Sequence, residues 1–146
     1  MEPLAWEIGE TSHAIRRAFD RRAASLGITR AQWRVLAHLD HQPGQRQVDL
    51  ADRMDIEPIT LCRIIDKLEE GALVERRRDP ADRRAWQLHL SESAAPLVKK
   101  LHDLATEFSD EVFGNLDPAA IEQARTLLGT VRSNLAGLSP RTKASA

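Results

Sequence analysis

Cysteine is almost missing from this 146-residue sequence, and long apolar runs are missing altogether. The single cysteine, Cys62, excludes an internal disulfide framework and favours a reducing compartment. No apolar run approaches the roughly 18–20 residues that a membrane-spanning helix needs. The first residues, Met1 to Leu4, lack the basic and apolar regions of a signal peptide. We therefore expect a cytoplasmic protein.

Signatures of catalysis are missing as well. The sequence contains no glycine-rich phosphate loop, no nucleophile elbow and no obvious pair of nucleophile and base. His38 and His41 have a spacing that could join a metal, but no cluster of cysteines or carboxylates accompanies them. We expect no enzyme, no metal site and no cofactor.

The net charge is small, at −1, but the charges are segregated along the chain. Residues 16–34 hold six arginines and one aspartate, and residues 76–84 hold five arginines and two aspartates. Residues 103–122 hold six carboxylates and no lysine or arginine. Such segregation lets a protein present a cationic face to phosphates. Solvated helix faces are the alternative, which fits residues 76–84 least because an arginine-rich turn repels itself without a partner.

Length and composition, with 42% hydrophobic and 29% charged residues, predict one globular domain. A first helix is expected from Pro3 to Leu26, because apolar residues recur there at helical spacing and Gly27 follows as a C-cap. Thr29 and Gln32 form a capping box that starts a second helix at Arg30, ending near His41. Two more helices are expected after residue 91, the last one opened by Asp117-Pro118.

Residues 47–91 carry the most informative pattern. A short amphipathic helix (Gln47–Met54), a turn and a second helix (Pro58–Gly71) lead into the basic loop 76–84, and the alternating strand Trp86–Leu90 follows. This order is the layout of a winged helix-turn-helix, which places one helix in a DNA major groove and a cationic loop beside it. We therefore predict a mainly α fold with a small β-hairpin wing.

The second of these helices has one apolar and one polar face. Leu61, Ile64, Ile65 and Leu68 form a buried arc at 100° per residue, so the exposed candidates near the helix start can meet base edges. An arginine there can pair with guanine, and the wing arginines suit a narrow minor groove. The predicted DNA-binding residues are Ile59, Thr60, Arg63 and Lys67 in the helix, and Arg77, Asp82, Arg83 and Arg84 in the wing. The alternative for Arg63 is an ion pair with Asp66 or Glu70 on a solvated helix.

The terminal helices are expected to form a dimerisation region. Residues 1–28 and 92–138 carry apolar stripes too long to be buried against residues 30–91, the expected DNA-binding part. A two-fold dimer would also present two recognition helices about 34 Å apart, one duplex turn. We expect a homodimer, with residues 139–146 as a flexible tail.

Two further features have alternative interpretations. Trp6, His13 and Arg17 share one face of the first helix and could bind a small aromatic acid; alternatively, Trp6 packs on a partner chain and the other two are solvated. Cys62 is expected to be half buried beside the DNA-reading helix face. It is either a structural cysteine or a redox-active one.

The sequence also resembles a known family. The segments 48–54, 60–69, 71–76, 79–84 and 88–91 are similar to those of the MarR (multiple-antibiotic-resistance regulator) family, and the resemblance covers essentially the whole chain. Its most specific part is the wing sequence Asp82-Arg83-Arg84, followed by the Leu-x-Leu-Ser strand that ends at Ser91. Two departures are Ala94, where the family usually has glycine, and Gly71-Ala72, where a charged residue followed by glycine is commoner.

The resemblance implies a homodimeric bacterial or archaeal regulator of pseudo-palindromic operators, most often a repressor. It places Arg83 and Arg84 in the minor groove, with Asp82 as their brace. Members often respond to phenolic or carboxylate ligands, in a pocket to which Trp33 could contribute.

We therefore expect a sequence-specific, double-stranded-DNA-binding transcriptional regulator, a repressor released by a small aromatic or phenolic ligand. The alternatives are a regulator that senses ligands or redox state through Cys62, and a winged-helix module that binds proteins and not DNA.

Overall fold

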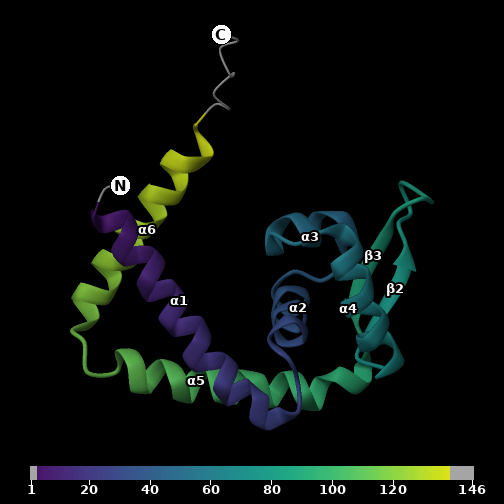
Figure 1. Cartoon of the computed structure of the whole chain (residues 1–146), viewed down its shortest axis with the longest axis horizontal. Helices are drawn as coiled ribbons and strands as arrows, with labels where there is room; N and C mark the ends of the chain where they lie inside the picture. The colour runs from purple at the N-terminus through teal and green to yellow at the C-terminus, as the bar shows by residue number, and fades with distance from the viewer. Residues whose placement is uncertain (1–2, 139–146) are drawn as a thin grey trace. The chain divides into compact units, whose positions relative to one another are not determined.

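The computed structural model describes residues 3–138, which form six α-helices and a three-stranded antiparallel sheet (Figure 1). This confirms the predicted mainly α winged-helix fold. The predicted tail 139–146 lies outside the described residues. The elements are α1 (Pro3–Ala23), a 3₁₀ turn (Ala24–Leu26), α2 (Arg30–His41), β1 (Gln45–Arg46), α3 (Gln47–Met54), α4 (Pro58–Glu70), β2 (Val74–Arg78), β3 (Trp86–Leu90), a second 3₁₀ turn (Glu92–Ala94), α5 (Ala95–Phe113) and α6 (Pro118–Ala136).

The chain divides into two compact units, and the boundary falls within α5 after Phe108. The first unit contains α1 to α4, the sheet and most of α5; the second contains the end of α5 and α6. No helix among residues 3–138 is both long enough and apolar enough to cross a membrane.

The helix boundaries follow local sequence signals. The Thr29 Oγ1 accepts a hydrogen bond from the Gln32 amide at 3.2 Å, and the Gln32 Oε1 accepts one from the Thr29 amide at 3.0 Å. This reciprocal pair is the predicted capping box, and it satisfies two amides that a helix start leaves unpaired. The first helix tightens into a 3₁₀ turn before Gly27, whose φ of +76° makes it the predicted C-cap.

The core of the first unit is built by α2, α3, α4 and the sheet. Apolar residues at helical spacing in the three helices meet the inward residues of β2 and β3, and burial of such side chains is the main driving force for folding. Together with Ala23 at the end of α1, its fully or almost fully buried members are Val35, Leu36, Leu39, Leu50, Ala51, Met54, Leu61, Ile65, Leu68, Val74 and Leu88. The face of α4 that the sequence predicts to be buried therefore packs inward.

The wing is a hairpin of β2 and β3, whose tip extends beyond α3 and α4 in Figure 1. Val74 pairs with Leu90 at one end of the hairpin and Arg78 with Trp86 at the other. The short strand β1 joins the other edge of β3, with Gln45 opposite Leu88, so the strand order is β1-β3-β2. The sequence did not predict β1, which ties the start of α3 to the wing.

In the second unit, α6 begins as predicted at Asp117-Pro118. The Asp117 Oδ1 accepts a hydrogen bond from the Ala119 amide at 3.1 Å, which caps the helix. No residue of α6 is buried in the single chain, and its Leu127, Leu128 and Leu135 are exposed.

Candidate nucleic-acid interface

Helix α4 separates its residues as the predicted helical wheel does. Leu61, Ile65 and Leu68 are buried, while the four candidate residues of this helix are exposed. Ile59 is 61% exposed although its side chain is large and apolar. A large apolar side chain held in solvent at the start of such a helix is suited to contact a thymine methyl group. Pro58 at the first turn fixes the backbone there without leaving an unpaired amide.

The guanidinium of Arg63 contacts no carboxylate in the part of the chain that the structure describes. The sequence left open an ion pair with Asp66 or Glu70. Instead, the Asp66 carboxylate is paired with Arg76 at 2.7 Å. Arg63 therefore keeps all five of its donors available for an outside partner.

The tip of the wing is held by two aspartates. The buried Asp79 accepts hydrogen bonds through Oδ1 from the amides of Ala81 (2.8 Å) and Asp82 (3.3 Å). Its Oδ2 receives the Arg46 Nε at 2.7 Å. The pKa of Asp79 is lowered, first by the Ala81 amide and then by the hydrogen bond from Arg46. Asp79 thus ties the tip to the start of α3.

Asp82 braces the tip through the backbone. Its Oδ1 accepts a hydrogen bond from the Arg84 amide at 3.0 Å, and its carbonyl accepts one from the Ala85 amide. Within residues 3–138 no guanidinium contacts Asp82, so the brace suggested by the family resemblance acts here on the Arg84 main chain. The side chains of Arg83 and Arg84 are exposed and have no partner among the described residues.

The remaining arginines of the basic run have partners. Arg77 pairs with Glu75 at 3.0 Å, and both side chains are more than half exposed. Arg78 stacks over the Trp86 ring at 4.3 Å and donates to the Arg83 carbonyl at 2.6 Å. This stacking braces the hairpin. Of the five arginines counted in the sequence, only Arg83 and Arg84 have unpaired side chains.

Helix α4 and the wing meet at one concave site. A cavity of about 280 Å³ is lined by residues from the starts of α3 and α4 and from the wing: Arg46, Gln47, Val48, Pro58, Asp82, Arg84, Ala85 and Trp86. The cavity places the start of α4 next to Arg84. Arg46, Gln47 and the 60% exposed Val48 were not predicted as site residues. Their placement depends on β1, for which the sequence carries no pattern.

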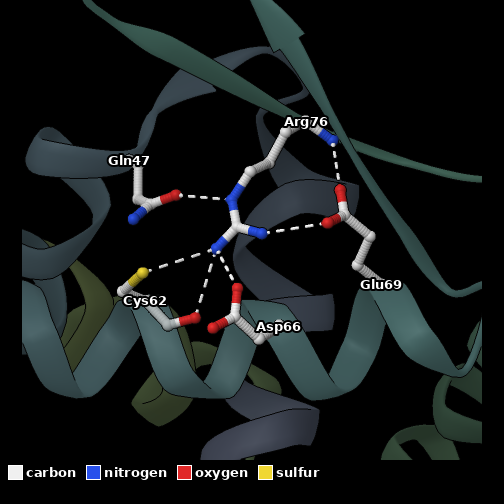
Figure 2. Close-up of polar contacts among 5 residues, drawn as sticks. All are labelled: Gln47, Cys62, Asp66, Glu69 and Arg76. Carbon is white, nitrogen blue, oxygen red and sulfur yellow. Dashed lines mark hydrogen bonds and ion pairs between the residues drawn. The ribbon is translucent and has the colours of Figure 1, made fainter.

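Arg76 has a different environment from the other arginines (Figure 2). Its side chain is only 13% exposed, and it reaches from β2 to partners on α3 and α4. Burial lowers its pKa, but the hydrogen bond with Asp66 and the charges of Asp66 and Glu69 raise it, and the net pKa lies above the ordinary value. Arg76 is therefore a fixed cation at the junction of the wing with α3 and α4.

Cys62 is half buried, as expected, and its Sγ lies 3.6 Å from the Arg76 Nη2. Its carbonyl accepts a hydrogen bond from the same nitrogen at 3.2 Å. In residues 3–138 there is no group of three or more histidines, cysteines or carboxylates arranged to hold a metal ion.

The four candidate ligand residues are not brought together. Trp33 is half buried; its Nε1 donates to the Asp20 Oδ1 at 2.8 Å, and its ring packs edge-on against Phe19 at 4.8 Å. A cavity of about 160 Å³ beside it is lined by Phe19, Trp33, Leu36, Ala37, Asp40, Val98, Leu101, His102 and Ala105. The candidates Trp6, His13 and Arg17 do not line this cavity and are exposed on α1.

Comparison with known proteins gives consistent matches. A sequence profile of the MarR family matches residues 26–85. Transcriptional regulator PA3341 is 31% identical over 92% of this chain and 99% of its own, with a TM-score of 0.84. A MarR transcriptional regulator from Methanosarcina mazei Go1 is 26% identical over 90% of this chain and 98% of its own, with a TM-score of 0.75.

A third structure is a cysteine-to-serine variant of MarR from E. coli in complex with operator DNA. It is 25% identical over 89% of this chain and 94% of its own, with a TM-score of 0.74. These matches extend over both compact units and share the winged architecture described above. The chain therefore belongs to the MarR family of transcriptional regulators.

Proposed function

We propose that this protein binds double-stranded DNA sequence-specifically as a homodimer on a pseudo-palindromic operator. One observation carries the proposal: the exposed start of α4 and the unpaired arginine Arg84 lie at the same concave site. Base-reading groups and a cationic wing at one site match the way winged helices bind a duplex. Residues 30–91 would contact DNA, and residues 1–28 and 92–138 would form the dimer.

Each candidate residue has a role that fits its environment. Arg63, which is exposed and unpaired, would bind guanine through two hydrogen bonds; Thr60 would bond a base or phosphate, and Ile59 would contact a thymine methyl. Lys67, one turn further along α4, would bind a phosphate.

The wing arginines would bind the same duplex beside α4. Arg83 and Arg84 would enter the minor groove, and Arg77 would exchange Glu75 for a phosphate. Phosphate contacts would supply most of the affinity.

We further propose that DNA binding represses transcription. A dimer that covers an operator excludes other proteins from the same stretch of DNA. The E. coli relative complexed with operator DNA supports the operator as the partner.

A small aromatic acid or phenol is the proposed inducer, and the cavity beside Trp33 supports it. Its volume of about 160 Å³ is close to that of an engineered apolar cavity of about 150 Å³ that binds benzene. His102 and Asp40, whose side chains form a 2.6 Å pair, supply polar groups at the lining. A ligand that binds more tightly to one spacing of the two recognition helices would shift the dimer towards that spacing.

The DNA-binding proposal is tested with Arg63→Ala and Arg84→Ala on an operator selected from a random pool. Arg63→Ala should lose affinity mainly at particular base pairs, about 1–3 kcal/mol per contact. Arg84→Ala should weaken binding more broadly and lower the salt dependence. Arg125→Ala, an exposed arginine of α6 paired with Glu122, is the control and should bind as the wild type does. If Arg63→Ala and Arg84→Ala lose equal affinity for every DNA sequence, the alternative of a winged-helix module that binds proteins is favoured.

The ligand proposal is tested by thermal shift with single-ring aromatic acids, with and without operator DNA. Ala105→Leu narrows the cavity and should abolish the shift, whereas Lys100→Leu, exposed on the same helix and outside the cavity lining, should keep it. An equal shift in both variants would place the ligand elsewhere. Stabilisation by ligands without any operator binding would favour a sensor that does not regulate through DNA.

A further inference from the structure

Arg76 belongs to the basic run of the wing, but each of its three guanidinium nitrogens has a partner within the protein. The Nε donates to the Gln47 Oε1 at 3.1 Å, and the Nη1 donates to the Glu69 Oε1 at 3.0 Å. The Nη2 lies 2.7 Å from the Asp66 Oδ1 and 3.2 Å from the Cys62 carbonyl oxygen. Only 13% of the side chain is exposed, so these internal partners hold most of the guanidinium away from solvent.

These contacts join three elements of the winged part of the chain. Gln47 is the first residue of α3, the three other partners lie along α4, and Arg76 itself belongs to β2, the first strand of the wing. The main chain takes part as well, because the Arg76 amide donates to the Glu69 Oε2 at 3.3 Å. Figure 2 shows the guanidinium at the centre of this cluster, with partners on several sides.

We propose that Arg76 is a positioning residue for DNA recognition. It fixes α4 relative to the wing, so that the base-reading start of α4 and the arginines of the wing tip engage one duplex at the same time. This inference rests on the proposed DNA binding and assigns Arg76 a role through other residues, with no contact to DNA of its own.

The geometry requires arginine and not merely a cation. A guanidinium offers five donors in a rigid planar fork, which here reach an amide oxygen, a main-chain carbonyl and two carboxylates. A lysine ammonium is a compact point charge with three donors on a flexible stem and cannot span α3 and α4 together. Arg76→Lys therefore keeps the charge and loses the connection.

The test compares Arg76→Lys and Arg76→Met with Arg84→Lys, in operator binding over a range of salt concentrations. Both Arg76 variants should lose about tenfold or more of operator affinity, with the salt dependence and the affinity for scrambled DNA unchanged. Arg84→Lys, which keeps a charge at an unpaired position, should lose less. If Arg76→Lys binds as the wild type does while Arg76→Met lowers the salt slope by about one, Arg76 contacts a phosphate directly and the proposal is wrong.

Two further variants separate positioning from other roles. Without Arg76, the carboxylates of Asp66 and Glu69, which are 53% and 45% exposed, would stand unpaired near DNA. If adding Asp66→Asn and Glu69→Gln to Arg76→Met restores wild-type affinity, Arg76 only masks the charges of these two carboxylates. The proposal that it positions α4 relative to the wing is then overturned. A lower melting temperature with an unchanged preference for operator over scrambled DNA would reduce Arg76 to a structural residue.

Hydrogen exchange of the DNA-free protein tests the connection independently of the proposed function. Arg76→Lys should speed exchange of the β2–β3 amides relative to those of α2, whose buried residues lie outside the cluster. Unchanged exchange in the hairpin contradicts the inference even if the protein binds DNA. If the wild type binds no duplex but the variant loosens the hairpin, the proposed function fails and the connection itself stands.

Discussion

Between residues 76 and 84, the arginines differ in what their guanidinium groups contact. Arg76 is buried in a cluster of acceptors, Arg78 stacks on Trp86, and Arg77 pairs with Glu75. Arg83 and Arg84 are left exposed and unpaired within residues 3–138. A count of charges in the sequence gives one patch of five cations, whereas the structure separates the three bracing arginines from the two whose side chains remain available to an outside partner.

Asp79 gives a prediction about acid stability. Because its pKa in the folded protein lies below the value near 3.9 of an unperturbed aspartate, its contribution to stability is present above that value and is lost as pH falls through the folded pKa. The free energy of unfolding of the wild type should therefore exceed that of Asp79→Asn at neutral pH, and the difference should shrink as the pH falls below about 3.9. Urea unfolding of both proteins at a series of pH values measures this difference in the free energy of unfolding. Asp103→Asn, exposed and paired with Lys99, is the control and should show little difference.

His38 gives a second prediction about pH. Its pKa is lowered, first by burial and then by the nearby charges of Arg34 and Arg53. Because the folded pKa lies below the unfolded value near 6.5, stability should be highest above that value and fall as the pH drops through it. His38→Gln should therefore narrow the difference in melting temperature between about pH 7.5 and pH 5.5, whereas His13→Gln on the exposed face of α1 should not. An unchanged difference in His38→Gln would contradict this.

At the scale of elements, local signals in the sequence predict helix starts and faces well. The capping box of Thr29 and Gln32, the Asp117-Pro118 start and the buried arc of α4 all depend on residues close in sequence. These features are confirmed. They explain why the fold class follows from the sequence.

Features that depend on distant residues did not follow from the sequence. Strand β1 has two residues, too few for a periodic pattern, and it exists because Gln45 pairs with Leu88 far along the chain. The partners of Arg76 come from two helices, and the cavity beside Trp33 is lined from α1, α2 and α5. Charge pattern alone cannot tell which arginines such contacts will occupy.

The turn after α4 contains a strained alanine, Ala72. Ala72 has a φ of +57°, in the left-handed region that costs an L-residue roughly 1–2 kcal/mol, whereas Gly71 before it has an ordinary φ of −78°. The family more often has glycine where this chain has Ala72. Ala72→Gly removes this strain, but glycine loses more conformational freedom on folding, which offsets part of the gain. The free energy of unfolding should therefore rise by up to about 1 kcal/mol, which urea unfolding measures. Gly71→Ala, at a position with room for a Cβ, should change it little, and a loss of stability in Ala72→Gly would refute the explanation.

At the scale of the whole molecule, each unit exposes apolar side chains in the single chain. In the first unit, Leu4 and Trp6 of α1 are 46% and 60% exposed. In the second, Leu127 and Leu135 of α6 are 49% and 60% exposed. Apolar side chains in such numbers on terminal helices are typical of an interface between chains. They support the proposed homodimer.

Charged substitutions on the exposed apolar face of α6 test the proposed homodimer. Leu128→Asp combined with Leu135→Asp places two carboxylates on the exposed apolar stripe, so the protein should become monomeric and lose most operator affinity. Asn134→Asp, exposed on another face of the helix, should remain dimeric. Sedimentation analysis gives the mass in solution. A wild-type-like dimer in the double variant would show that this stripe is not the interface.

The proposed function depends on two copies of this chain binding one duplex, each through the start of α4 and the tip of the wing. Selection of duplexes from a random pool, followed by measurement of stoichiometry and footprint on the selected site, tests this most directly. The expected result is a two-fold-symmetric site with half-site centres about 10 base pairs apart and two chains per duplex. No enrichment over random DNA, or one chain bound to an asymmetric site, would contradict it.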